Sequence, residues 1–242
     1  MTTRTDEIAE DIFRISTFEE GMPLNFNQFL IRADQPLLFH TGHRSMFPAV
    51  SGAVAALVPL DQLRWVAFGH LESDECGAVN EFLAAAPLAE VTHSVIGCLV
   101  SLGDMADRAP QPIGDGDVLD LGGRRLRQVD TPHVPHGWDA RLLYEETTGT
   151  LFCGDLFTRT GDTEALTTGD IVGPAEEAED LFGATCLTPS TAPTIRRLAE
   201  LEPTTLALMH GPTFQGDGSA ALRTLADGYA RRLDAAFAAA GA

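Results

Sequence analysis

The stretch Phe68-Gly69-His70-Leu71-Glu72-Ser73-Asp74 decides how this chain is interpreted. His70, Glu72 and Asp74 stand at alternate positions, so an extended segment projects all three side chains toward the same side. An imidazole and two carboxylates held close together are costly unless a cation compensates their charge. The trio therefore predicts a metal site.

Three further segments share one plan, in which a short β-prone run ends at a His or an Asp beside a Gly or a Pro. The runs end at Pro132-His133, Gly154-Asp155 and His210-Gly211. Layered α/β proteins gather their functional groups at strand ends. We therefore expect His133, Asp155 and His210 to lie close to the trio that begins at His70.

The composition suits a single globular domain over residues 1–242. Of the 242 residues, 44% are hydrophobic and 21% are charged, which is enough to bury a sizeable core. The formal net charge of −19 argues against a nucleic-acid or anionic-membrane partner, because both attract positive surfaces. The chain shows no leader peptide and no apolar run long enough to span a bilayer, so we expect a cytoplasmic protein. The four cysteines form no Cys-x-x-Cys pair, and thiolate ligands are not expected.

The pattern of elements predicts a four-layer α/β/β/α sandwich, because two strand-rich halves are each flanked by helices. The first half has expected strands at 12–16, 26–32, 36–40 and 64–68, with helices at 48–57 and 75–86. The second half has expected hairpins within 117–129 and 141–153, and helices from 174, at 194–201 and at 220–240. The polar stretch 158–172 is expected to form a loop near the mouth of the site.

The order of the six candidate ligands resembles the ligand set of the metallo-β-lactamase fold, and specifically its flavodiiron branch, where the second ligand is Glu. These ligands are His70, Glu72, Asp74, His133, Asp155 and His210. The segments 25–31 and 151–155 also resemble that family, and the likeness covers nearly the whole chain. The resemblance implies that one iron is bound by His70, Glu72 and His133 and a second by Asp74 and His210, with Asp155 as the bridge.

Imidazole mixed with carboxylate, without thiolate, suits iron or manganese, although charge alone fits two zinc ions equally well. The flavodiiron branch is known for a diiron pair that binds O2 or NO and passes electrons to it. Its members continue into a flavodoxin domain that this sequence does not contain. The resemblance thus implies a stand-alone diiron protein without flavin, often a homodimer, that binds, senses or reduces the gas with electrons from an external donor protein.

Two alternatives belong to other functional classes. In the first, the same fold holds a dinuclear metallohydrolase whose metal-bound hydroxide attacks an ester, thioester or lactone. In the second, the domain binds a partner without metal, which the intact set of six ligands argues against. Metal analysis discriminates among the three, because it distinguishes iron, zinc and no metal.

The sequence departs from the family pattern at two positions. Glu75 stands where the family usually has a His, and it is either an extra ligand of the second metal or an acid in the first turn of a helix. His40 stands where the fold usually has an Asp, and we expect it to be a hydrogen-bonded structural group. His136 and Trp138 are candidates for the second shell or for a gate of the pocket, with a surface loop as the alternative.

Overall fold

Alternation of side chains along each strand gives the sheets two buried faces. The computed structural model describes residues 2–241. In β3 (Leu24–Ile31), Phe26 and Leu30 join a hydrophobic cluster that includes helical residues. Phe29 and Ile31, on the opposite face, join a cluster formed by residues of both sheets. A strand of this kind must be covered on both sides, which is the requirement for an inner layer of a sandwich.

The first sheet contains seven strands and combines an antiparallel and a parallel part. The four N-terminal strands pair antiparallel with one another. Each of the three strands that follow pairs parallel with the strand before it. Its order is β1 (Thr3–Ala9), β2 (Ile12–Glu19), β3, β4 (Leu37–Phe39), β5 (Trp65–Ala67), β6 (Glu90–Ser94) and β7 (Gln111–Ile113).

The second sheet also contains seven strands and is mixed. The expected turn at Gly122 and Gly123 joins two of its strands, and both glycines have positive φ (77° and 88°). Such values suit a tight hairpin turn. Its order is β12 (Leu166–Thr167), β14 (Thr213–Gln215), β13 (Thr205–Ala207), β11 (Thr150–Phe152), β10 (Arg141–Glu145), β9 (Arg125–Asp130) and β8 (Val118–Asp120).

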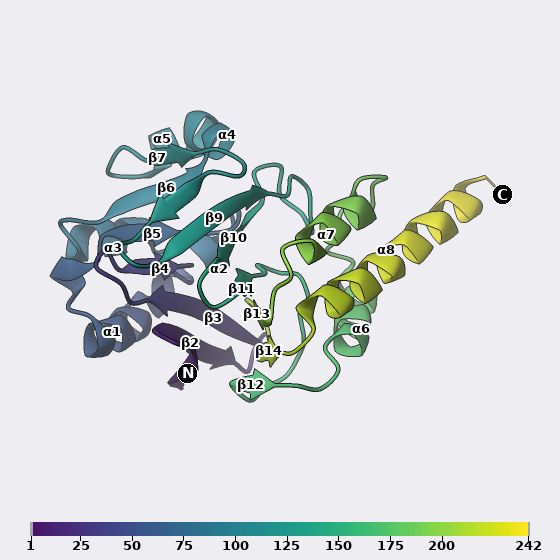
Figure 1. Ribbon diagram of the computed structural model, residues 1–242, viewed down its shortest axis with the longest axis horizontal. Helices are drawn as coiled ribbons and strands as arrows, with labels where there is room; N and C mark the ends of the chain where they lie inside the picture. Colours follow the sequence, from purple (N-terminus) through teal and green to yellow (C-terminus); the bar gives the residue numbers. More distant parts are fainter. Residues whose placement is uncertain (1, 242) are drawn as a thin grey trace.

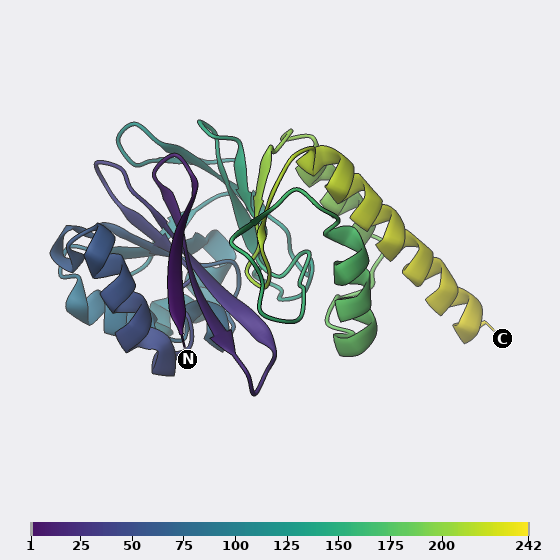
Figure 2. The ribbon, with the colours of Figure 1, turned by 90° about the horizontal axis from the view of Figure 1, so that it is seen from below.

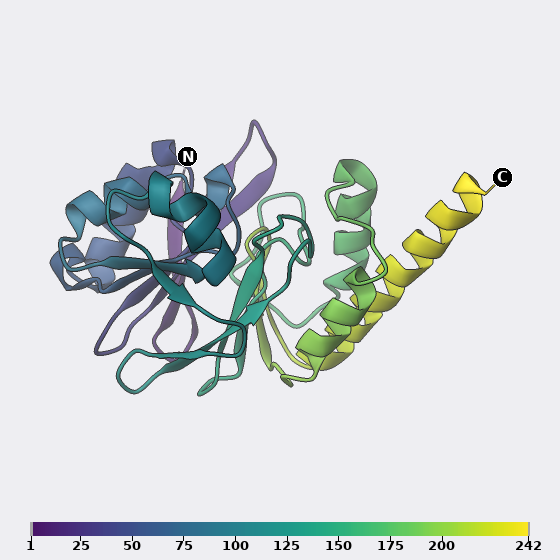
Figure 3. The ribbon, with the colours of Figure 1, turned by 90° about the horizontal axis from the view of Figure 1, so that it is seen from above.

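The helices fall into two groups, one for each sheet. The first group is α1 (Phe47–Leu57), α2 (Ser73–Cys76), α3 (Val79–Ala85), α4 (Val95–Gly97) and α5 (Gly103–Met105), with short turns η1 (Arg44–Met46), η2 (Leu60–Gln62) and η3 (Cys98–Leu102). The second group is α6 (Val172–Phe182), α7 (Thr191–Ala199) and α8 (Gly218–Ala240). Figure 1 shows the first group beside the first sheet and the second group beside the second sheet. Figures 2 and 3 show the strands between these two helical layers.

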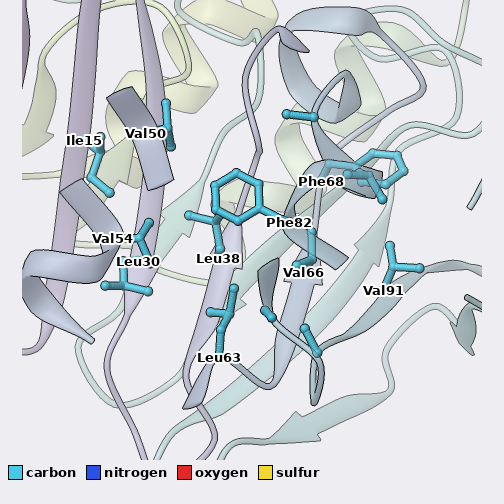
Figure 4. Packing of buried hydrophobic residues seen from close by; sticks show 14 of the residues in the cluster. Ile15, Leu30, Leu38, Val50, Val54, Leu63, Val66, Phe68, Phe82 and Val91 are labelled. Carbon is cyan, nitrogen blue, oxygen red and sulfur yellow. The ribbon is translucent and has the colours of Figure 1, made fainter. Parts of the chain in front are cut away.

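Three hydrophobic clusters correspond to the three interfaces of a four-layer sandwich. Figure 4 shows the cluster between the first sheet and its helices, where Leu30 and Leu38 face Val54 of α1 and Phe82 of α3. A second cluster joins the second sheet to α6, α7 and α8, and a third lies between the sheets. The predicted α/β/β/α architecture is therefore confirmed.

Two expectations about local structure were wrong. The helix expected at 75–86 is two short helices, α2 and α3. They separate near Gly77, where an added Cβ would lie 2.3 Å from the backbone oxygen of Ser73. The expected loop at 158–172 contains the short strand β12, which pairs with β14. Within residues 2–241, no helix is both long and apolar enough to cross a bilayer.

Candidate metal centre

The loop that follows β5 is shaped by a buried carboxylate. Oε2 of Glu75 accepts hydrogen bonds from the backbone N–H groups of Gly69 (2.7 Å) and His70 (2.6 Å). A Cβ on Gly69 would lie 2.9 Å from the same oxygen, so the close approach requires glycine. Helix α2 begins at Ser73. The chain thus turns tightly at the strand end and presents His70, Glu72 and Asp74 toward the second sheet.

One group of four side chains offers a set of donor atoms for a single metal ion. One ligand atom from each of His70, Glu72, His136 and Asp155 lies within 4.8 Å of the other three. His70 Nε2 is 2.7 Å from Glu72 Oε2, and His136 Nε2 is 3.0 Å from the same oxygen. Asp155 Oδ2 is 3.2 Å from His136 Nε2 and 3.7 Å from His70 Nε2. Imidazole nitrogens and carboxylate oxygens therefore converge on one point.

A second group shares Asp155 with the first. His210 Nε2 lies 3.3 Å from Asp74 Oδ2 and 3.4 Å from Asp155 Oδ1. His210 Nδ1 is 2.9 Å from the backbone oxygen of Asn25, which fixes the ring with Nε2 toward the carboxylates. Asp155 therefore directs Oδ2 to the first group and Oδ1 to the second. This is the geometry that a bridging carboxylate requires.

The structure corrects the expected position of one ligand, because it does not bring His133 to the cluster. His133 is exposed and has a left-handed backbone conformation (φ 64°), and its N–H donates to the oxygen of Gly137 (2.7 Å). This turn carries His136, three residues later, into the place expected for His133. An added Cβ on Gly137 (φ 83°) would lie 3.1 Å from His70 Cβ, so glycine lets the turn pack against the His70 side chain.

The sequence carried no signal for the correct histidine, because the left-handed conformation of Gly137 (φ 83°) is a property of the folded turn. The rings of His70 and His136 meet edge to face, with centroids 4.6 Å apart. Trp138, which we expected near His136, has 39% of its surface exposed and does not line the cavity beside the site. The expectation of a role for Trp138 in the second shell has no support from its position.

Glu75 lies in the first turn of α2, as one alternative stated, but its side chain is fully buried beneath His70. Its Oε1 is 3.2 Å from His70 Nδ1 and 3.5 Å from His40 Nε2. A carboxylate at Nδ1 fixes the ring and leaves Nε2 for a metal ion. The geometry therefore favours Glu75 as a support of His70. His40 is buried and contacts this carboxylate, as expected of a structural group.

The clustered carboxylates of the site favour positive charge beside them. Burial disfavours an imidazolium, but the charge of Glu75 and the hydrogen bond with Glu72 raise the pKa of His70 to about 12. The contacts of His210 with Asp155 and Asp74 likewise outweigh burial and raise the pKa of His210 to about 10. Hydrogen bonds from the two histidines of the first group lower the pKa of Glu72. Protonated imidazoles thus supply the charge that a metal ion would supply in their place.

Two buried oxygens of the proposed metal ligands lack hydrogen-bond partners. Within the described residues, Oδ1 of Asp74 and Oδ1 of Asp155 accept no hydrogen bond that meets normal geometry. Buried carboxylate oxygens are rarely left unsatisfied, and a cation is one way to satisfy them. These oxygens and the mixed imidazole and carboxylate set fit two metal ions, with iron, manganese and zinc all compatible with the donors.

The comparisons with known proteins agree with this architecture. Residues 24–211 match the family described as "ODP family beta lactamase". A putative diflavin flavoprotein A 2 of Synechocystis sp. is 28% identical over 208 residues, which cover 82% of this chain and 35% of that protein. The anaerobic nitric oxide reductase flavorubredoxin of Aeromonas hydrophila is 28% identical over 136 residues, which cover 55% of this chain and 27% of that protein.

A solved structure gives the same result. The metal-soaked Flv1 flavodiiron core from Synechocystis sp. superposes with a TM-score of 0.76 at 25% identity, over 96% of this chain and 61% of that chain. The chain thus spans about a third of the length of the curated relatives that it matches. Over residues 24–211 the chain belongs to the ODP family of beta-lactamase-like proteins, and its fold is that of the flavodiiron cores.

Proposed function

We propose that this protein holds two non-haem iron ions and binds O2, or the related diatomic NO, beside them. His70, Glu72 and His136 would hold the first ion, Asp74 and His210 would hold the second, and Asp155 would offer one oxygen to each group. The observation that carries this proposal is the division of the two Asp155 oxygens between the two groups. One carboxylate placed in this way has no comparable role in a mononuclear site.

The protein side chains set the geometry and the charge of the site. The Glu75 carboxylate lies 3.2 Å from His70 Nδ1, and the backbone oxygen of Asn25 lies 2.9 Å from His210 Nδ1, so both rings present Nε2. Glu72 adds a negative charge and a hard oxygen donor, which favours the higher oxidation state of iron. When bound, two iron ions supply open coordination positions for a diatomic gas and electrons to reduce it.

We further propose that residues 1–242 act as one domain and that a separate donor protein supplies the electrons. All the donor side chains lie at one end of a single sandwich, and the names of the matched relatives identify flavoproteins and a nitric oxide reductase. These names favour redox chemistry over the hydrolase alternative. Storage, sensing and reduction of the gas would all begin with its binding at this site.

Gas reactivity tests the proposal directly. Iron-loaded, reduced protein is mixed with O2 in an anaerobic stopped-flow instrument, and the visible spectrum is followed. We expect a new absorption band that is absent from an Asp155→Asn variant, because the variant replaces the shared carboxylate. An unchanged spectrum in the iron-loaded protein contradicts the proposal. Hydrolysis of simple esters by the zinc-loaded protein, without any reaction of the iron form with O2, supports the hydrolase instead.

A further inference from the structure

A cavity much larger than a diatomic gas opens beside the metal centre. Its volume is about 290 Å³, and part of its lining comes from the donor side chains Glu72, Asp74, His136, Asp155 and His210. A water molecule occupies roughly 30 Å³, so the cavity has room for roughly ten water-sized groups. Pockets for small organic molecules begin at about 300 Å³. The space therefore suits an organic ligand.

The walls of the cavity are apolar and come from distant parts of the chain. Leu24 and Phe26 of β3 form one side, and Ala175 and Ala178 of α6 form another. Figure 3 shows the β2–β3 hairpin (purple) and α6 (green) in the same part of the molecule. The two alanines are buried and stand three residues apart on one face of α6. Their small side chains leave open the space that larger residues would fill.

The cavity lining also contains a polar cluster made of Glu179, Thr185 and Tyr229. Thr185 Oγ1 donates to Glu179 Oε2 (2.7 Å), and the Tyr229 hydroxyl donates to the same oxygen (3.3 Å). Burial raises the pKa of Tyr229 to about 12, so Tyr229 is neutral at ordinary pH. Within residues 2–241, Glu179 has no ion pair with a basic side chain within 4 Å. A hydrogen-bond donor or a cation is the complement to the Glu179 carboxylate.

We propose that the cavity binds a small, largely apolar organic molecule whose hydroxyl or ammonium group contacts Glu179, with its apolar body between β3 and α6. A carboxylate head group beside Glu179 would bring two like charges together, so a neutral or cationic head group is favoured there. This inference goes beyond gas binding, because the apolar walls and Glu179 are independent of the metal that the centre holds.

Three probes with the same apolar chain and different head groups test the selectivity: hexan-1-ol, hexylammonium and hexanoate. Binding is measured by calorimetry and by saturation-transfer NMR, on metal-loaded protein and on protein treated with a chelator. We expect the alcohol and the ammonium ion to bind both forms. In the chelated protein, where no metal ion attracts the carboxylate, we expect hexanoate to bind at least about tenfold more weakly than the other two probes. Equal binding of hexanoate by the chelated protein, or no binding of any probe at millimolar concentration, overturns the proposal.

Variants locate the binding within the cavity. Ala178→Phe fills the space and should weaken hexanol at least about tenfold, while the matched Ala235→Phe on an exposed position of α8 should have no effect. Ala175→Leu gives the same test with a smaller side chain if Ala178→Phe does not fold. Glu179→Gln should weaken hexylammonium about tenfold and leave hexanol nearly unchanged. Binding that is unaltered in both filled variants contradicts the assignment.

The metal content of each sample separates this proposal from the previous one. Probe binding by chelated protein supports the cavity whatever metal the centre prefers. A protein that binds two irons but no probe retains the proposed gas site and loses the organic ligand. A protein that binds the probes but takes up no metal supports the organic ligand and contradicts the proposed gas site.

Discussion

Glu75 is the residue through which the support of the metal centre can be tested separately from its ligands. Its Oε2 accepts two backbone N–H groups, and its Oε1 lies 3.2 Å from His70 Nδ1. Glu75→Ala leaves both buried N–H groups without an acceptor, at about 1–3 kcal/mol each. We therefore expect Glu75→Ala to lower the free energy of unfolding by about 2–6 kcal/mol.

Glu75→Gln separates the support of His70 from the stability of the loop. The Gln oxygen can still accept the two backbone N–H groups, so the fold is largely retained. The amide nitrogen of Gln, however, is a hydrogen-bond donor, so His70 Nδ1 must accept a hydrogen bond from it. The proton of the neutral imidazole then lies on Nε2, where the metal would bind. Loss of such support typically lowers metal affinity about 10–100-fold. We expect a loss in that range.

The assays are chelator competition for metal affinity and urea unfolding for stability, with the exposed Glu177→Gln on α6 as the matched control. The reasoning is refuted if Glu75→Gln keeps the affinity of the unmodified protein, or if it is as unstable as Glu75→Ala. Complete loss of one ion in Glu75→Gln, with the other unaffected, would identify Glu75 as a direct ligand instead.

Three further substitutions address the ligand assignment and the turn beside it. His136→Ala should release the first ion, whereas His133→Ala should leave the metal content unchanged, and elemental analysis of the two variants decides between these histidines. Glu72→His removes a negative, hard donor and should raise the ratio of bound zinc to bound iron when both are supplied, with slower reaction toward O2; an unchanged ratio refutes this role. Gly137→Ala places a Cβ at positive φ and 3.1 Å from His70 Cβ, so it should lower the free energy of unfolding by at least about 1–2 kcal/mol in a denaturant titration, and an unaltered midpoint contradicts the account of the turn.

Strand patterns and strand ends were readable from the sequence because they depend on local chemistry. Alternating apolar residues predicted β2 and β3, and the runs that end near His70, Asp155 and His210 placed these side chains at one edge of the sandwich. The edge strand β1 was missed because its exposed positions are polar and give no apolar alternation.

The histidine of the turn after β9 could not be identified from spacing alone. His133 follows the strand more closely, but the hydrogen bond of its N–H to Gly137 reverses the chain and delivers His136. The position of Glu75 was equally inaccessible, since an acid after Asp74 turns inward only because Gly69 admits its carboxylate. Both features depend on the path of the backbone in three dimensions, which residue order does not specify.

The cavity between the elements was even harder to predict from the sequence. Ala175 and Ala178 read as ordinary residues of an amphipathic helix, and they border a cavity only because α6 docks across from β3. The docking of α6 depends on its packing with the second sheet and with α8, where Ala175 joins the same hydrophobic cluster as Leu225. The cavity is therefore a property of the assembled layers.

The metal content of the protein tests the central claim most directly. The protein is expressed with ample iron, purified without oxygen and analysed for iron, zinc and manganese per chain. The two groups that share Asp155 predict about two ions per chain, mostly iron. About one ion per chain, or zinc in preference to iron under these conditions, would contradict the account.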